Sequence, residues 1–159
     1  FDMVRIGIAL YGLWPSIKFA KKFIRLGLKP VLSWKTRIVQ TKRIKKNTPV
    51  GYGITERVVR NSNIAVLPAG YYDGYDRHLS SIGRVLIRGQ RCKVLGRISM
   101  NLTVVDVTDC SSARTGDEAV LIGQQGQDSI TAEELAQKTN TISYEVVSRI
   151  NQLLPRIYV

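Results

Sequence analysis

The sequence is poor in the residues that build most metal and thiol sites. His78 is the only histidine, so a multi-histidine metal site cannot be assembled from this chain alone. The two cysteines, Cys92 and Cys110, lie outside any CxxC spacing and cannot form a zinc site by themselves, so we expect no metal and reduced, structural thiols. No apolar run approaches the roughly 20 residues of a membrane-spanning helix. The sequence therefore predicts a soluble chain.

Acidic residues are scarce in the first part of the chain. Residues 1–60 contain 14 Lys and Arg against 2 Asp and Glu, whereas residues 61–159 contain 10 of each, so the net charge of +12 arises in the first part. A nucleic-acid-binding face over residues 18–46 is one hypothesis. This segment lacks the interleaved exposed aromatic residues of a base-stacking platform, so a solvated or interdomain face is favoured.

The start of the chain indicates a piece of a longer protein. A chain of 159 residues with 44% apolar residues can bury the core of one domain. Residues 3–11 predict a buried strand that begins without a lead-in. Residues 15–30 predict a linker with a short basic helix near residues 19–26, ended by Gly27 and Pro30.

From residue 31 onward, short strands predominate. The pattern predicts strands over residues 34–44, 63–67, 102–107 and 118–122, and a hairpin of residues 83–88 and 91–96 that turns at Gly89 and Gln90. Turn signals recur about every 8 to 15 residues, which favours a β-barrel or β-sandwich over βαβ units.

Two helices and a final strand complete the prediction. Thr131 and Glu134 have the spacing of a capping box at the start of the first helix. Residues 141–154 place apolar side chains every four residues and predict a second, amphipathic helix. Residues 156–159 predict a strand. The fold class is therefore mainly β with two short helices.

The most specific feature is a pair of tyrosine motifs 19 residues apart. Tyr52 lies between Gly51 and Gly53, and Tyr71 follows Gly70 in a glycine-flanked run that reaches Tyr75. Glycines let the backbone turn sharply and present a side chain from a loop. The sequence therefore predicts a site carried by loops. Asp73 precedes Gly74 and is predicted to form a turn.

Six motifs occur in a fixed order. They cover residues 5–12, 50–53, 70–77, 96–101, 116–123 and 141–145. In this order they resemble the C-terminal part of the pyridoxal-phosphate-dependent alanine racemases, from Arg5 to Arg156. The resemblance implies a truncated last strand of an N-terminal (β/α)8 barrel over residues 1–14, a linker over 15–30 and the family's barrel-like β-domain over 31–159.

The resemblance also implies an activity. Family members interconvert L- and D-alanine with pyridoxal 5′-phosphate, in a cytoplasmic head-to-tail homodimer that shares its active sites and supplies D-alanine for peptidoglycan. Tyr52 matches the family's tyrosine base, and a lysine serves as the second base and holds the cofactor. That lysine lies in the family's N-terminal part, so this chain alone is expected to be inactive.

The resemblance assigns further residues to cofactor and substrate. Arg5 matches the arginine that faces the pyridine nitrogen, and the N–H groups of Gly7 and Ile8 match a phosphate site. Tyr144 matches a tyrosine that binds the phosphate and narrows the pocket. Residues that match the substrate side and its entrance corridor are Met100, Tyr71, Arg77, Arg97 and Ile142. Asn101 stands where the family often has aspartate.

Three alternatives stay open at this stage. An apolar pocket rejects one added hydroxyl only about a hundredfold, so a serine/alanine racemase domain of a larger protein is possible, although the bulk of Tyr144 favours alanine. A basic β-rich nucleic-acid-binding module and a purely structural dimerisation domain are the other two.

Overall fold

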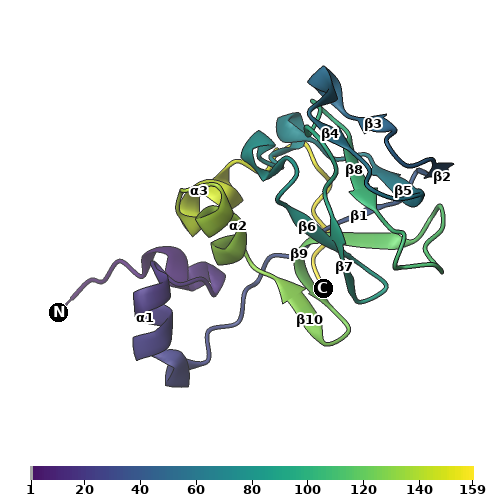
Figure 1. Ribbon diagram of the computed structural model, residues 1–159. Helices are drawn as coiled ribbons and strands as arrows, with labels where there is room; N and C mark the ends of the chain where they lie inside the picture. Colours follow the sequence, from purple (N-terminus) through teal and green to yellow (C-terminus); the bar gives the residue numbers. More distant parts are fainter. Residues whose placement is uncertain (1) are drawn as a thin grey trace.

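The computed structural model describes residues 2–159, apart from the side chains of Ile17 and Ile24. Figure 1 shows an N-terminal segment with helix α1 on one side and a β-rich body on the other, with helices α2 and α3 between them. No helix in the described part of the chain has the length and apolar character needed to cross a membrane.

The larger sheet has five antiparallel strands in the order β1-β9-β6-β7, with β10 paired to β9. Its members are β1 (Trp34–Arg37), β6 (Arg84–Ile87), β7 (Gln90–Lys93), β9 (Glu118–Gln125) and β10 (Asp128–Ile130). The predicted β6–β7 hairpin is confirmed. Its turn is Arg88-Gly89, one residue earlier than predicted, because Gln90 pairs with Ile87 and both turn residues have positive φ, at 51° and 75°.

The second sheet has three antiparallel strands, and a short hairpin lies beside it. The sheet has the order β2-β5-β8, with β2 (Gln40–Ile44), β5 (Ser62–Leu67) and β8 (Thr103–Asp106), and the hairpin pairs β3 (Pro49–Val50) with β4 (Glu56–Arg57). A bridge between Val94 and Val105 joins the sheets, and Leu95 N–H donates to Val104 O at 2.8 Å. The two sheets therefore wrap around one core, as a barrel-like domain requires.

The prediction of a single strand over residues 34–44 was wrong. The chain leaves the larger sheet after Arg37 and enters the smaller one at Gln40. Ile38 N–H donates to Asp117 O at 2.9 Å, and Val39 N–H donates to Val66 O at 3.0 Å. Two neighbouring residues thus bond to different sheets, so the chain crosses from one to the other at this point.

The core lies between the sheets and under the helices. Its largest fully buried side chain is Tyr75, whose ring meets Trp34 edge-on with centroids 6.0 Å apart. Burial raises the pKa of the Tyr75 phenol well above its usual value, so it stays neutral. Cys92 and Cys110 are free and buried, and burial raises the pKa of Cys92 to about 12. The thiols are therefore structural, as expected.

Helix α2 (Ala132–Lys138) begins as predicted. The hydroxyl of its N-cap Thr131 accepts from Glu134 N–H at 3.1 Å. Helix α3 spans Ser143–Ser148, so the predicted helix over residues 141–154 was too long. Beyond its end the chain turns away: Asn151 N–H donates to Asp73 O at 3.0 Å, and the Asn151 side chain accepts from Leu153 N–H at 2.9 Å. These bonds replace the helical ones, while Ile150 and Leu154 still pack on the core.

The ends of the chain differ from the predicted strands. Residues 2–6 have no regular structure and Gly7–Tyr11 form a 3₁₀ helix, η1, because no described strand lies beside this segment to complete a ladder. Residues 156–159 are exposed and irregular for the same reason. The predicted basic helix is present as α1 (Ile17–Lys22), followed by the 3₁₀ turn η2 (Ile24–Leu26).

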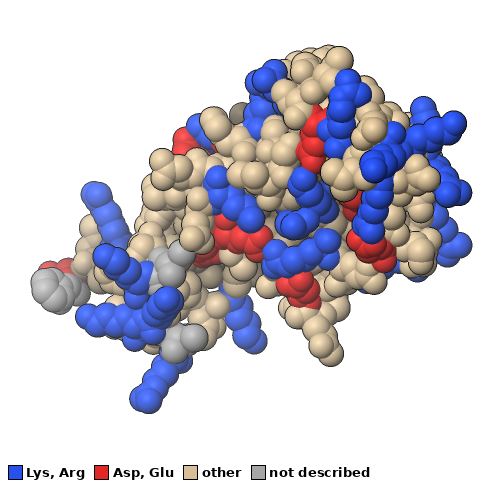
Figure 2. All heavy atoms as spheres, in the orientation of Figure 1, with Lys and Arg blue, Asp and Glu red and all other residues tan. Residues whose placement is uncertain are grey.

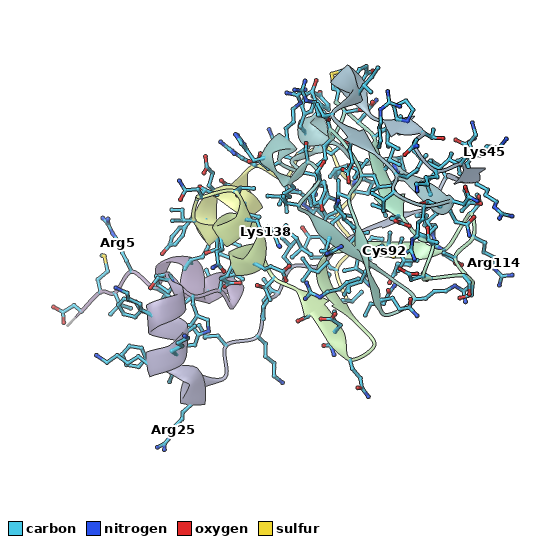
Figure 3. All side chains as sticks on the ribbon, viewed as in Figure 1. Arg5, Arg25, Lys45, Cys92, Arg114 and Lys138 are labelled. Atoms are coloured by element: carbon cyan, nitrogen blue, oxygen red, sulfur yellow. The ribbon has the colours of Figure 1, made fainter. Side chains whose placement is uncertain are left out.

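The basic residues do not form one face. Figure 2 shows Lys and Arg over the α1 region at one end of the molecule and over β2 and β3 at the other. Figure 3 places Arg25 and Lys45 at these opposite ends. The basic segment over residues 18–46 is thus divided between two distant surfaces.

Candidate functional site

Tyr52 lies at the tip of the β3–β4 hairpin, in the 3₁₀ turn η3 (Tyr52–Ile54). Gly51 and Gly53 on either side have φ values of 76° and 73°, which side-chain-bearing residues rarely adopt. A Cβ on Gly51 would lie 2.8 Å from Arg97 N. The turn therefore packs directly on the Arg97 loop, and the Tyr52 side chain is left 69% exposed.

The loop between β7 and β8 carries Arg97 and Met100. Its Gly96 approaches Val50 so closely that a Cβ would lie 2.4 Å from the Val50 carbonyl oxygen. The Arg97 guanidinium lies against Gly53, where a Cβ would be 3.2 Å from Nη1. Ile98 is buried, whereas Arg97 and Met100 are exposed. The buried isoleucine anchors the loop and leaves the two predicted side chains facing outward.

Tyr71 lies in the 3₁₀ turn η4 (Tyr71–Asp73), which is bound to the same loop. Tyr71 N–H donates to Ser99 O at 3.0 Å, and Tyr72 N–H donates to Met100 O at 2.8 Å. The Asp73 carboxylate accepts from Gly70 N–H at 2.9 Å, so it shapes the turn as predicted. The half-exposed Tyr71 side chain is therefore held next to Met100.

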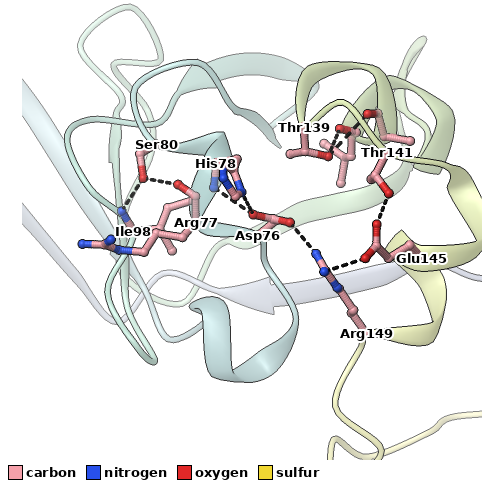
Figure 4. A network of polar contacts seen from close by, with 11 residues as sticks. Asp76, Arg77, His78, Ser80, Ile98, Thr139, Thr141, Glu145 and Arg149 are labelled. Carbon is pink, nitrogen blue, oxygen red and sulfur yellow. Dashed lines mark hydrogen bonds and ion pairs between the residues drawn. The ribbon is translucent and has the colours of Figure 1, made fainter.

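Arg77 joins this group through a serine. It begins the 3₁₀ turn η5 (Arg77–Leu79), and its carbonyl accepts from Ser80 Oγ at 2.5 Å. Ser80 Oγ in turn accepts from Ile98 N–H at 3.0 Å, as Figure 4 shows. The structure thus brings together five predicted residues, which we name the Tyr52 group: Tyr52, Tyr71, Arg77, Arg97 and Met100.

The other five predicted residues form a second group, the Arg5 group: Arg5, Gly7, Ile8, Ile142 and Tyr144. Ile8 is buried in a small cluster with Leu13 and Ala132, against which Val146 and Val147 pack. Ser143 is buried and its hydroxyl donates to Trp14 O at 3.3 Å. The N-terminal segment is therefore attached to the start of α3. Ile142 and Tyr144, on either side of Ser143, remain 56% and 38% exposed.

The two groups are separate on this chain. Within residues 2–159, no hydrogen bond joins a member of one group directly to a member of the other. They are linked indirectly: Arg149, after α3, donates to Asp76 at 2.8 Å and pairs with Glu145, and Asp76 caps η5 (Figure 4). Partial burial raises the pKa of Asp76, but its bonds to His78 and the Arg149 charge outweigh this and lower it.

The two groups offer different chemistry. The Arg5 group supplies hydrogen-bond donors: a guanidinium, a phenol, and the N–H groups of Gly7 and Ile8. These two N–H groups lie in the first turn of η1, so they have no carbonyl partner within the helix. Such donors suit an anion or an aromatic nitrogen. The Tyr52 group offers an exposed phenol beside a guanidinium. Among the described residues, no cluster of three His, Cys, Asp or Glu side chains could hold a metal ion.

Two residues at the centre of the Tyr52 group were missed from the sequence, Glu56 and Ser80. Ser80 carries no sequence signal that separates it from other loop serines. Glu56 does: it is one of two acidic residues within residues 1–60 and stands four positions after Tyr52. An isolated carboxylate in a basic segment next to a motif could have marked it.

Comparison with known proteins identifies relatives of this geometry. The family model described as "Alanine racemase, C-terminal domain" matches residues 31–158. Alanine racemase from Leptospira interrogans is 47% identical over 164 residues, which cover 100% of this chain and 42% of that protein. Alanine racemase from Methylacidiphilum infernorum is 50% identical over 157 residues, covering 99% and 39%.

Solved structures agree with the sequence relatives. Alanine racemase from Bacillus anthracis, with bound L-Ala-P, superposes with a TM-score of 0.93 at 35% identity, covering 100% of this chain and 40% of that one. The enzyme from Streptomyces lavendulae also gives 0.93, at 38% identity, covering 100% and 41%. The chain thus spans about 40% of the length of the relatives it matches.

Proposed function

This chain belongs to the alanine racemase family, of which it spans the C-terminal domain, and on that premise we propose that the polypeptide containing it interconverts L- and D-alanine. One observation carries the proposal. Tyr52, which matches the family's base, is exposed on a rigid glycine turn beside Arg97 instead of being packed into the domain. The phenol is therefore accessible to a group outside this chain, as a base that acts on a substrate must be.

The donors of the Arg5 group fit pyridoxal 5′-phosphate. We propose that Arg5 donates to the pyridine nitrogen and that the phosphate is bound by Tyr144 and by the N–H groups of Gly7 and Ile8. When bound, this cofactor supplies an electron sink that acidifies the Cα proton of an amino acid. Because a guanidinium stays protonated, Arg5 donates a hydrogen bond and leaves the ring nitrogen neutral, which weakens the sink and disfavours side reactions.

Tyr52 acts on the Cα proton in this proposal. Racemisation removes a proton from one face and returns one to the other, so two bases are required. Tyr52 serves the L face, and the lysine that serves the D face lies in the part of the relatives that this chain does not span. A phenol with the ordinary pKa of about 10 needs a neighbour that favours its ionised form, which in the family is a histidine outside the matched segment.

The separation of the two groups supports a homodimer. We propose a head-to-tail pair in which the Tyr52 group of one protomer completes the Arg5 group of the other. In that arrangement Met100 and Tyr71 bind the substrate carboxylate side, while Arg77, Arg97 and Ile142 line the entrance. The dimer works in the cytoplasm and supplies D-alanine for peptidoglycan. The present chain, which lacks the cofactor lysine of this scheme, is expected to be inactive.

The alternatives have less support. The basic segment over residues 18–46, the candidate nucleic-acid-binding face, has Arg25 and Lys45 at opposite ends of the molecule, so it does not form one continuous face (Figure 3). A structural dimerisation domain does not explain why the tyrosine is exposed between two glycines beside Arg97. Acceptance of serine remains a variant of the same function, and the partly exposed Tyr144 beside the proposed phosphate site favours the smaller alanine side chain.

The test is deuterium exchange at Cα in the full-length parent protein with pyridoxal phosphate. L- and D-alanine are incubated separately in deuterated buffer with wild type and Tyr52→Phe. Tyr52→Phe is expected to lose exchange from L-alanine by about 10² to 10⁴-fold and to retain exchange from D-alanine, because the lysine still serves that face. Tyr158→Phe, at the exposed C-terminal end, is the matched control.

Two results would contradict the proposal. A wild-type parent that exchanges neither enantiomer is not an alanine racemase. Equal exchange by Tyr52→Phe and wild type would show that Tyr52 is not the base, and the family match would then describe the fold alone.

A further inference from the structure

Glu56 is a partly buried carboxylate next to the Tyr52 group. It lies on β4 directly opposite Val50 on β3, so its backbone closes the hairpin whose tip carries Tyr52. Arg57, Val59 and Arg60, which follow it, are exposed, whereas the Glu56 side chain is only 15% exposed. The carboxylate therefore points inward, on the side of the hairpin where Val50 and Val58 are buried, toward the loops that carry the other members of the group.

Three donors from two other segments converge on this carboxylate. Oε2 accepts from Gly96 N–H at 2.7 Å and from Ser81 Oγ at 2.5 Å, and Oε1 accepts from Lys93 Nζ at 2.5 Å. Gly96 immediately precedes Arg97. Ser81 follows Ser80, which is bonded to the Arg77 carbonyl. One side chain thus ties the Tyr52 hairpin to the Arg97 loop and to the Arg77 turn.

Charge makes these bonds strong. Partial burial raises the pKa of Glu56, but the bonds from Lys93, Ser81 and Gly96 outweigh burial and lower the pKa below its usual value. Glu56 is therefore ionised at neutral pH and pairs with Lys93. Ser81 has a φ of 61°, a left-handed conformation that is unfavourable for serine, so its bond to Glu56 helps to hold the Arg77 turn in a strained shape.

Close packing transmits the position of Glu56 to Tyr52. Gly96 and Gly51 meet the facing backbone at distances that leave no room for a Cβ, so the hairpin and the Arg97 loop fit in one register only. Among the described residues, the bond from Gly96 N–H to Glu56 is the one hydrogen bond between the hairpin and this loop, so without the carboxylate van der Waals contacts alone would hold the two together. Because Tyr52 lies at the tip of the hairpin, small movements of the loosened hairpin would displace its phenol.

We propose that Glu56 is a positioning residue, whose carboxylate sets the position of the Tyr52 phenol relative to Arg97 and Met100. The inference rests on the proposed function, and it adds a residue that acts through Tyr52 without touching substrate or cofactor. Lys93 is its counter-ion, and Ser81 and Gly96 are the points at which it holds the two neighbouring loops.

The first test uses kinetics of the full-length parent protein. Glu56→Ala is expected to lower kcat for alanine racemisation by about 10- to 100-fold, with a smaller change in KM, because the base is misplaced by a fraction of an ångström. Glu56→Gln keeps an oxygen for Gly96 N–H and should recover most of the loss. Glu118→Ala, which removes a Glu–Lys pair at the surface of β9 and β1, is the matched control and should behave as wild type.

An isotope effect separates positioning from a general structural role. The two enantiomers have equal free energy, so kcat/KM falls equally in both directions, and only the isotope effect reveals which proton transfer slowed. In Glu56→Ala the Cα-deuterium isotope effect should rise with L-alanine, whose proton Tyr52 removes, and should not rise with D-alanine. A loss of folded protein would change neither value.

The second test needs no activity. Hydrogen–deuterium exchange of the cofactor-free parent, followed by mass spectrometry, should be faster in Glu56→Ala than in wild type for peptides covering residues 49–57 and 94–100. The peptide covering residues 118–125 should be unchanged. If Glu56→Ala does not fold, Lys93→Met removes one donor and should give a smaller change in the same direction.

The outcomes distinguish the two proposals. Wild-type kinetics and exchange in Glu56→Ala, together with an impaired Tyr52→Phe, would overturn the role of Glu56 and leave the racemase intact. A wild-type parent without racemase activity would overturn the proposed function and, with it, the positioning role, while faster exchange in Glu56→Ala would still show that the carboxylate holds the loops. A raised isotope effect with both enantiomers would also overturn the inference.

Discussion

The Tyr52 group and the Arg5 group are held in place very differently. Every loop of the Tyr52 group is hydrogen-bonded to another loop of the same group, through Gly96, Ser99 or Ser80. The Arg5 group stands partly on residues 2–12, which contact the rest of the chain through the buried Ile8, a bond from Val31 N–H to Tyr11 O and the neighbouring Trp14. The difference shows that hydrogen bonds within this chain fix the geometry of the Tyr52 group, whereas fewer contacts hold the Arg5 group.

Exposure of apolar side chains supports the same distinction. Met3, Val4, Ile6 and Leu10 are 61% to 84% exposed, whereas Leu67, Val85 and Val105 in the β-rich body are fully buried. Burying a side chain of this size contributes about 1.5 to 3 kcal/mol. The N-terminal segment does not gain this stabilisation, so its conformation is less strongly determined than that of the β-rich body.

The largest predicted effect compares two leucines. Leu67→Ala in β5 should lower the free energy of unfolding of this chain by about 2 to 5 kcal/mol, because it leaves a cavity in the core. Leu10→Ala in η1 should change it by less than about 0.5 kcal/mol, because the side chain is 67% exposed. Urea denaturation followed by tryptophan fluorescence measures both. Similar losses would show that the two regions are packed alike.

A smaller effect compares two glycines with nearly the same backbone conformation. Gly96 and Gly7 have φ values of 66° and 63°, and an added Cβ would meet Val50 O at 2.4 Å in the first and nothing within 4 Å in the second. Gly7→Ala should cost about 1 kcal/mol of conformational strain. Gly96→Ala should cost at least roughly 1 kcal/mol more, because the hairpin must shift as well. Equal losses of stability in thermal unfolding would mean that the hairpin moves aside for the added Cβ at little energetic cost.

The smallest effect concerns the link between the groups. The pKa of Asp76 is lowered in the folded chain, so its ionised form stabilises the fold above the unfolded value of 3.8, and this contribution is lost as the pH falls through the lower folded value. Asp76→Asn should therefore be less stable than wild type at pH 7, by up to about 1 kcal/mol, and the difference should shrink as the pH falls below 3.8 and vanish once the pH is below the lower folded value. Thermal unfolding across pH 2 to 7 measures it, and a constant difference would contradict the assigned cause.

Local signals in the sequence predicted local structure correctly. Thr131 and Glu134 predicted the start of α2, and Arg91 and its neighbours predicted the β6–β7 hairpin to within one residue of its turn. Each of these features depends on residues close in sequence. The glycines around Tyr52 predicted an exposed turn for the same reason, since their positive φ values require it.

The sequence predictions failed where distant residues decide. The apolar periodicity predicted that the second helix continues to residue 154, but α3 ends at Ser148, and Asn151 N–H donates to Asp73 O instead of to a helical carbonyl. Residues 34–44 looked like one strand, but Asp117 and Val66 bond its central residues to different sheets. Residues 3–11 had the composition of a strand, and composition cannot supply the neighbouring strand that a ladder requires.

The sequence by itself determined the family, the mainly β architecture and the residues that carry the proposed chemistry, because ordered motifs and short-range signals are local properties of the chain. Only the tertiary structure decided how those residues are divided. It placed Tyr52, Tyr71, Arg77, Arg97 and Met100 in one group whose loops are hydrogen-bonded to each other, and left Arg5 and Tyr144 in another. It also revealed that Glu56 joins the Tyr52 hairpin to the Arg97 loop and to the Arg77 turn. Hydrogen bonds between residues 18 to 40 positions apart leave no periodicity in the sequence, so their partners emerge only when the chain is folded.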